Sequence, residues 1–127
     1  MSDHIVSAFT DELDKLAADI LRMGGIVETM ILDACAAVNK NDVDAARDVV
    51  ARDEQVDKLE ADVERQIVSL IARRQPMAHD LRAVFSALKV VGELERIGDL
   101  SKNIAKRTLR LDENVGASMR KGIYRMA

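Results

Sequence analysis

Two groups of oxygen-bearing side chains stand at helical spacing in this chain. Within each group, successive members are three or four residues apart, so they lie on one face of an α-helix. The groups are Asp53, Asp57 and Glu60, and Glu95, Asp99 and Asn103. Because hard cations bind oxygen ligands, the sequence predicts a metal site formed by these six residues.

A turn at Pro76, the single proline, brings the two groups to the same level. Proline fixes φ and lacks an N–H, so it favours a turn or the first residue of a helix. If the chain folds back there, Asp53 comes level with Asp99 and Asp57 with Glu95, roughly 30 Å from the turn. Four carboxylates at one level repel one another, which implies a bound cation, a cationic side chain or protonation.

The carboxylate oxygens do not identify the cation. They suit Mg²⁺, Ca²⁺, Mn²⁺ or iron, whereas zinc is atypical without a histidine or cysteine ligand. The competing interpretation is a solvated acidic face without a metal. Its charge would be balanced by four basic side chains on the same helices, which are Arg52, Lys58, Arg65 and Arg96.

Apolar residues at heptad spacing predict three helices that position these acids, over residues 2–38, 42–74 and 77–111. Acids continue the apolar seam at three positions, Asp53, Glu60 and Glu95. Gly24 and Gly25 lie within the first seam, which continues in phase beyond them and therefore indicates close packing or a bend. The predicted fold is an all-α antiparallel three-helix bundle. The third helix also carries a second apolar stripe, which predicts cover from two sides: Val90, Leu94, Ile97, Ile104 and Leu111.

Beyond this unit of residues 1–111, we expect residues 112–127 to form a loop and the start of a fourth helix. The segment LDENVG, residues 111–116, has the composition of a loop. After it, Met119, Ile123 and Met126 have the spacing of an apolar helix face. Such a short helix needs a partner, so we expect it to pair with another copy of the chain or to bend back on the bundle.

The composition argues against several classes of protein. One cysteine cannot form an internal disulfide, and no apolar run resembles a signal peptide or a membrane span. We therefore expect a soluble, cytoplasmic protein. Residues 100–127 carry 7 basic and 2 acidic side chains, which could face an acidic partner, anionic lipid or solvent. A nucleic-acid binder needs a broader basic surface with stacking aromatics, and the sequence predicts none.

Catalysis is the main alternative to a binding role, since ferritin-like di-iron enzymes also place carboxylates on facing helices. Those enzymes need Glu-x-x-His on two helices, and neither His4 nor His79 follows a glutamate by three residues. His79 is expected at the surface and Cys35 in the core. Ser101 and Thr108 have no histidine or lysine placed to activate them. The sequence therefore predicts a protein without catalytic residues.

The segment RRQPMAHDLRAVFSALKVVGELERIGD, residues 73–99, resembles the PhoU family. Repeats of that family carry a similar arginine-glutamine-proline turn, aspartate-leucine-arginine helix start and glutamate-arginine-isoleucine-glycine-aspartate motif. The resemblance implies a negative regulator of phosphate uptake and of the phosphate-starvation response. Such a regulator would act as an adaptor between the ATPase of the phosphate ABC transporter and a phosphate sensor kinase, at the inner face of the membrane through these partners.

The resemblance also bears on the metal and on the extent of the chain. Some PhoU proteins bind iron or zinc clusters, which here implies Asp53, Asp57, Glu95 and Asp99 as principal ligands, with Glu60 and Asn103 as further contributors. PhoU proteins usually contain two three-helix repeats. This chain contains one and the beginning of a second, as a truncated or incomplete product would.

Overall fold

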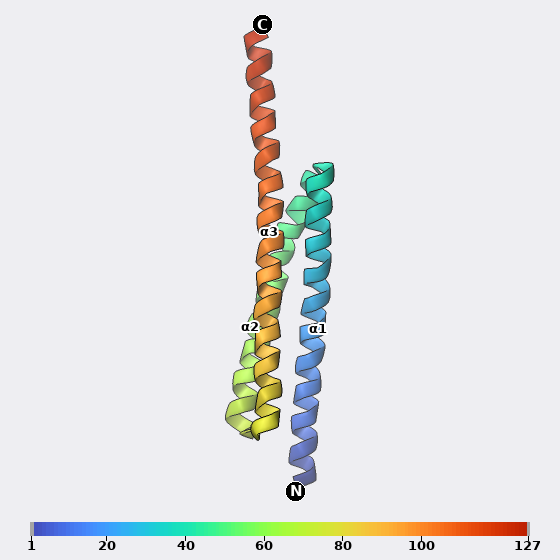
Figure 1. The fold of residues 1–127 in the computed structure, drawn as a ribbon, viewed down its shortest axis with the longest axis vertical. Coiled ribbons are helices and arrows are strands. Elements are labelled where there is room, and N and C mark those ends of the chain that lie inside the picture. Colours follow the sequence, from blue (N-terminus) through green and yellow to red (C-terminus); the bar gives the residue numbers. More distant parts are fainter. Residues whose placement is uncertain (1, 127) are drawn as a thin grey trace.

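Three long helices form the part of the protein that the structure describes. The structure, a computed structural model, describes residues 2–126, with side chains for residues 8–117 and Met119. The helices are α1 (Ser2–Lys40), α2 (Val43–Arg74) and α3 (Ala78–Met126). α1 and α3 run in one direction and α2 runs antiparallel to both (Figure 1). The predicted antiparallel three-helix bundle is confirmed.

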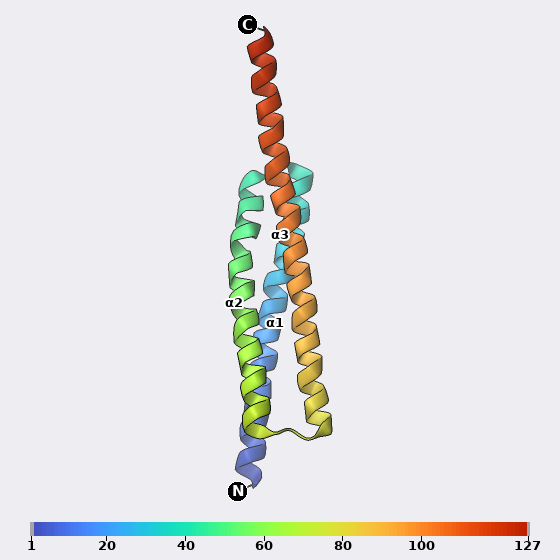
Figure 2. The ribbon, with the colours of Figure 1, turned by 90° about the vertical axis from the view of Figure 1, so that its left-hand side faces the viewer.

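Both turns have caps that explain where the helices stop. After α1, Asn41 adopts a left-handed φ of 52°, and the Asp42 carboxylate accepts a hydrogen bond of 3.1 Å from the backbone N–H of Ala45. This contact satisfies a free N–H at the start of α2. At the other end of α2, Gln75 has φ 46° and donates its N–H to the carbonyl of Ile71. Pro76 follows, and the chain reverses into α3 (Figure 2).

The core follows the heptad seams of the sequence. Seven residues of α2 are buried, and six of them are apolar: Ala46, Val49, Val56, Val63, Ile67 and Leu70. The seventh is Asp53, which is 4% exposed at a seam position, as predicted. α1 passes unbroken through its two glycines, and a Cβ at Gly24 would lie 3.9 Å from the Leu94 methyls of α3. The helix therefore does not break at Gly24, and a Cβ there would be at ordinary contact distance from Leu94.

One expectation for α3 is wrong, and another holds only in part. No loop interrupts the helix at residues 111–116, and α3 continues to Met126 without a separate fourth helix. That segment contains no proline, and a single glycine and asparagine lower helix propensity without stopping the helix. The second apolar stripe is covered only in part: Val90, Ile97 and Leu111 are 46%, 39% and 60% exposed, whereas Leu94 and Ile104 pack against the core.

Of the remaining expectations for single residues, one is confirmed and one is wrong. His79 is at the surface beside Asp80, as predicted. Cys35 is exposed, so its predicted core position is wrong. Met119 is 64% exposed, whereas the side chains of His4, Ile123 and Met126 lie outside the described residues. Within residues 2–126, no helix is both long and apolar enough to span a membrane.

Candidate metal centre

Antiparallel packing of α2 against α3 brings the predicted acids together. The carboxyl of Glu60 hydrogen-bonds to that of Glu95, and the charges of Asp53, Asp99 and Glu95 all act on Asp57. The observed pairs lie within one helical turn of those predicted from a fold at Pro76, and residues 75–77 form a short non-helical connection before α3 begins. Five of the six predicted residues therefore form one carboxylate cluster: Asp53, Asp57, Glu60, Glu95 and Asp99.

Close contact between the helices needs a small residue at the position of Gly98. A Cβ at this position would lie 3.6 Å from Val56 Cγ1 and 3.9 Å from Asp53 Oδ1. Gly98 is itself buried, one residue before Asp99. A Cβ would therefore be in ordinary contact, whereas a longer side chain here would separate α3 from α2.

Lys102 supplies a positive charge to the cluster, and the sequence analysis missed it. Its Nζ lies 3.1 Å from Asp53 Oδ2, and the two side chains are 31% and 6% exposed. The hydrogen bond and charge of Asp53, followed by the charges of Asp57 and Asp99, raise the pKa of Lys102. Lys102 is seven residues after Glu95 and therefore on the same face, which is the signal that could have identified it.

The four basic residues expected to balance the cluster do not pair with its carboxylates. Arg52 pairs with Asp33 at 2.6 Å and with Asp48 at 3.0 Å. Arg65 pairs with Asp62, and Arg96 with Glu93. Lys58 forms no ion pair with the residues whose side chains are described. A solvated acidic face balanced by these four residues is therefore not what the structure contains.

Protonation relieves the remaining repulsion. Burial, followed by the hydrogen bond and charge of Glu95 and then the charge of Glu64, raises the pKa of Glu60 to about 7. Burial and the charge of Asp53 raise the pKa of Asp57, while Lys102 opposes this shift. A pKa of about 7 means that Glu60 carries its proton for part of the time near neutral pH, which removes one negative charge from the cluster.

The carboxyl groups of the cluster suit a hard cation, although in this structure the described side chains are not positioned to hold one. Five carboxyl groups from two facing helices give oxygen ligands of the type that Mg²⁺, Mn²⁺ and iron accept. Among the described residues, no three His, Cys, Asp or Glu side chains are positioned to hold a metal ion. Asn103 is exposed and lines a surface hollow with Leu100 and Arg107.

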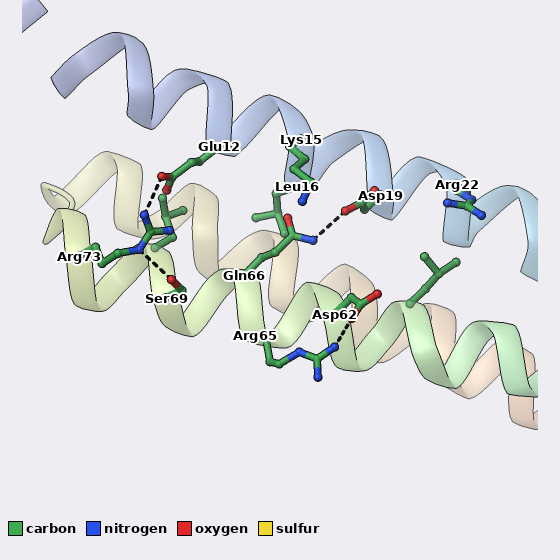
Figure 3. A pocket seen from close by; sticks show the side chains of 12 residues that line it. Glu12, Lys15, Leu16, Asp19, Arg22, Asp62, Arg65, Gln66, Ser69 and Arg73 are labelled. Atoms are coloured by element: carbon green, nitrogen blue, oxygen red, sulfur yellow. Dashed lines mark hydrogen bonds and ion pairs between the residues drawn. The ribbon is translucent and has the colours of Figure 1, made fainter. Parts of the chain in front are cut away.

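A second polar site lies between α1 and α2, away from the carboxylate cluster. It is a groove of about 580 Å³ in which charged side chains from the two helices pair with one another (Figure 3). Glu12 accepts hydrogen bonds from Arg73 at 3.2 Å and from Arg74 at 3.0 Å, and the bond from Arg74 is the largest cause lowering the pKa of Glu12. These pairs connect α1 to the end of α2, so the groove has a structural explanation.

Comparison with known proteins places these helices in a known group. Residues 20–108 match the family model described as the PhoU domain. A phosphate-specific transport system accessory protein PhoU homolog of Caulobacter vibrioides is 48% identical over 113 residues, and that of Rhizobium meliloti is 41% identical over 106. These alignments cover 89% and 84% of this chain.

A solved structure shows the same arrangement of helices. The crystal structure of PhoU from Pseudomonas aeruginosa matches 84% of this chain with a TM-score of 0.81 and 39% sequence identity. The chain spans 51% of that protein and 49% and 45% of the Caulobacter and Rhizobium relatives. It therefore corresponds to about half the length of these relatives.

Proposed function

Because this chain belongs to the PhoU family, we propose that it acts as a negative regulator of phosphate uptake and of the phosphate-starvation response. In this role it is a non-catalytic adaptor between the ATPase of the phosphate ABC transporter and a phosphate sensor kinase. The observation that carries the proposal is the match over residues 20–108, which includes the whole carboxylate cluster. The names of the relatives, accessory proteins of the phosphate-specific transport system, support the transporter as a partner.

The environment of the hydroxyl groups supports a non-catalytic role. Ser101 donates its hydroxyl to the carbonyl of Ile97 at 2.7 Å, and Thr108 donates to the carbonyl of Ile104 at 3.2 Å. Both hydroxyls thus satisfy the backbone of their own helix. A side chain held in this way has no base to activate it as a nucleophile.

A phosphate-regulated reporter tests the regulatory role. Deletion of the gene should raise reporter expression in phosphate-rich medium, and this chain supplied in trans should lower it. Pull-downs with the chain should retain the transporter ATPase and the sensor kinase. An unchanged phosphate response after deletion, with neither partner retained, would show that the proposed function is wrong. Fractionation of the same cells should place the chain in the cytoplasm or at the inner face of the membrane.

For the carboxylate cluster we propose a metal-bound state, with iron, Mn²⁺, Mg²⁺ or Zn²⁺ as candidates. Asp57, Glu60, Glu95 and Asp99 would supply most of the ligands, with Asp53 released by Lys102 and Asn103 as a further contributor. A bound cation would neutralise the cluster and link α2 to α3. Metal binding there would require Lys102 to turn toward solvent and Glu60 to lose its proton, so it would be linked to pH.

Metal titration tests this site without any assay of activity. Calorimetry and thermal unfolding of the chelator-treated chain should show binding and a metal-dependent rise in Tm. Asp57→Asn and Asp99→Asn should weaken both, whereas Glu54→Gln, which removes an exposed acid from α2, should not. Equal metal affinity in all four proteins would contradict the proposal.

We also propose that the end of α3 associates with a second copy of the chain. The side chain of Met119 is 64% exposed, and Leu111 and Val115 on the preceding turns are 60% and 55% exposed. α3 does not bend back on the bundle at this point (Figure 1). Met119→Ser should lower the mass measured by light scattering if this surface joins two copies, and a monomeric wild type would contradict the proposal.

A further inference from the structure

Lys102 occupies the position of a cation in the carboxylate cluster. Its Nζ lies 3.1 Å from Asp53 Oδ2, which is close enough for a hydrogen bond as well as an ion pair. The charges of Asp57 and Asp99 also act on this ammonium group. Three of the five carboxylates thus already interact with a positive charge that belongs to the chain itself. The ammonium group is a stand-in for the cation that oxygen ligands of this kind suit.

The buried member of the ion pair is the carboxylate. The side chain of Asp53 is 6% exposed, whereas that of Lys102 is 31% exposed. Asp53 lies at an apolar seam position, so its charge is costly without a partner. Among the residues whose side chains the structure describes, no other lysine or arginine forms an ion pair with it. In the metal-free protein, the stability of this part of the bundle therefore depends on Lys102.

The lysine is the member of the pair that can leave. Its ammonium group ends a flexible chain of methylene groups, and about a third of the side chain is already exposed. The ammonium group can therefore move into water while α2 and α3 stay in place. Asp53 has no such route, because its short side chain is buried beside Gly98 where the two helices meet. Any exchange of cations at Asp53 thus requires the withdrawal of Lys102.

An ammonium group and a metal ion exclude each other at this position. Both are positively charged, and a few ångström apart in a partly dehydrated site they would repel one another strongly. Asp53 Oδ2 must also give up its hydrogen bond from Lys102 before it is free to act as a ligand. The free energy of the Lys102–Asp53 pair therefore opposes the binding of metal.

We propose that Lys102 is an internal competitor of the metal ion, which neutralises part of the carboxylate cluster in the metal-free protein and raises the metal concentration at which the cluster fills. The inference rests on the metal-bound state proposed above. It assigns two effects of opposite sign to one lysine, since the same side chain stabilises the metal-free bundle and weakens the binding of metal. A lysine with a purely structural role would have only the first effect.

Calorimetric titration of the chelator-treated chain with Mn²⁺ tests the proposal, with Fe²⁺ titrated in parallel under anaerobic conditions. Lys102→Met keeps an apolar side chain and removes the charge, so it should lower the dissociation constant of the metal by about tenfold or more. Its Tm should be lower than that of wild type without metal, and the rise in Tm on adding metal should be larger.

Two further variants serve as controls for the titration. Lys102→Arg keeps the positive charge and should bind metal as weakly as wild type. Lys106→Met removes an exposed lysine from the next turn and should leave the dissociation constant unchanged. Tighter binding by Lys106→Met as well would show that the effect comes from the net charge of the chain, and would overturn the proposal.

Acetylation of lysines provides a readout on the unsubstituted chain. Mass spectrometry after treatment with acetic anhydride reports how readily each amine reacts. The ion pair with Asp53 should keep Lys102 less reactive than Lys106 in the metal-free protein, and saturation with Mn²⁺ should raise its reactivity toward that of Lys106. Unchanged reactivity of Lys102 in the metal-saturated protein would overturn the proposal. This measurement remains decisive if Lys102→Met fails to fold.

The outcomes separate this proposal from the metal site on which it rests. Equal metal affinities of wild type and Lys102→Met would overturn the competition and leave the site intact. Uptake of metal by Lys102→Met alone would support the competition in its strongest form. If neither protein binds metal, the metal-bound state and the competition are both wrong. The phosphate-regulated reporter is scored separately, so the regulatory role does not depend on any of these results.

Discussion

Lys102 of α3 holds Asp53 of α2 through an ion pair of 3.1 Å at the centre of the bundle. Asp53 occupies a seam position and is 4% exposed, so its charge would be costly without a partner. The ammonium group also lies near enough to Asp57 and Asp99 for their charges to raise its pKa. One lysine therefore offsets part of the repulsion within the carboxylate cluster.

Replacement of Lys102 should show how much the stability of the protein depends on its ion pair with Asp53. In chelator-treated protein, Lys102→Met should lower the free energy of unfolding by about 1–2 kcal/mol, since it leaves a buried carboxylate without its partner. Urea denaturation measures the change. Lys106→Met removes an exposed lysine from the next turn and should change stability by less than about 0.5 kcal/mol. Equal stability of the two variants would show that the ion pair is unimportant.

Glu60 should make the metal-free protein less stable as pH rises. Its pKa is about 7 in the folded chain against an ordinary value of 4.5, so between these values the folded state retains a proton that the unfolded state has released. Stability should fall across this window and then level off above it. Glu60→Gln should reduce this fall and raise Tm at pH 8. Parallel Tm curves for wild type and variant between pH 4.5 and 8 would contradict the assignment.

The pair of Glu12 with Arg74 should make the protein less stable as pH falls, which is opposite to the effect of Glu60. The pKa of Glu12 is lowered in the folded protein, so its contribution is complete above its ordinary value of 4.5 and is lost as pH falls through the lower folded value. Glu12→Gln should lower Tm slightly at pH 7 and less at pH 3, because partly exposed pairs are weak. Glu28→Gln, at an exposed position of α1, serves as the control and should show no such pH dependence.

Two substitutions at Gly98 should separate backbone propensity from packing. Gly98→Ala places its Cβ at ordinary contact distance from Val56 and Asp53 and should stabilise the helix by up to about 1 kcal/mol. Gly98→Leu should destabilise the bundle by about 1–3 kcal/mol, because its larger side chain forces α2 and α3 apart. Thermal unfolding measures both. If both variants matched wild type, the close approach at Gly98 would not constrain the site.

The sequence predicted the fold where periodicity and turn chemistry agreed. Heptad spacing and the turn at Pro76 were sufficient to place Asp57 near Glu95, because antiparallel helices joined by a short turn have a nearly fixed register. The loop at residues 111–116 was wrong, since local composition resembles a turn without forbidding a helix. Lys102 was missed because which cation reaches Asp53 depends on side-chain direction and not on charge pattern alone.

The unbroken length of α3 has a mechanical consequence. Its 49 residues make a rod of roughly 70 Å, and Asp99 lies near its middle. Hydrogen bonds along the backbone keep such a rod stiff, so a tilt of about 5° at Asp99 displaces the far end by roughly 3–4 Å. Any rearrangement of the carboxylate cluster that reorients α3 is thereby amplified at the end of the helix beyond the turn between α1 and α2.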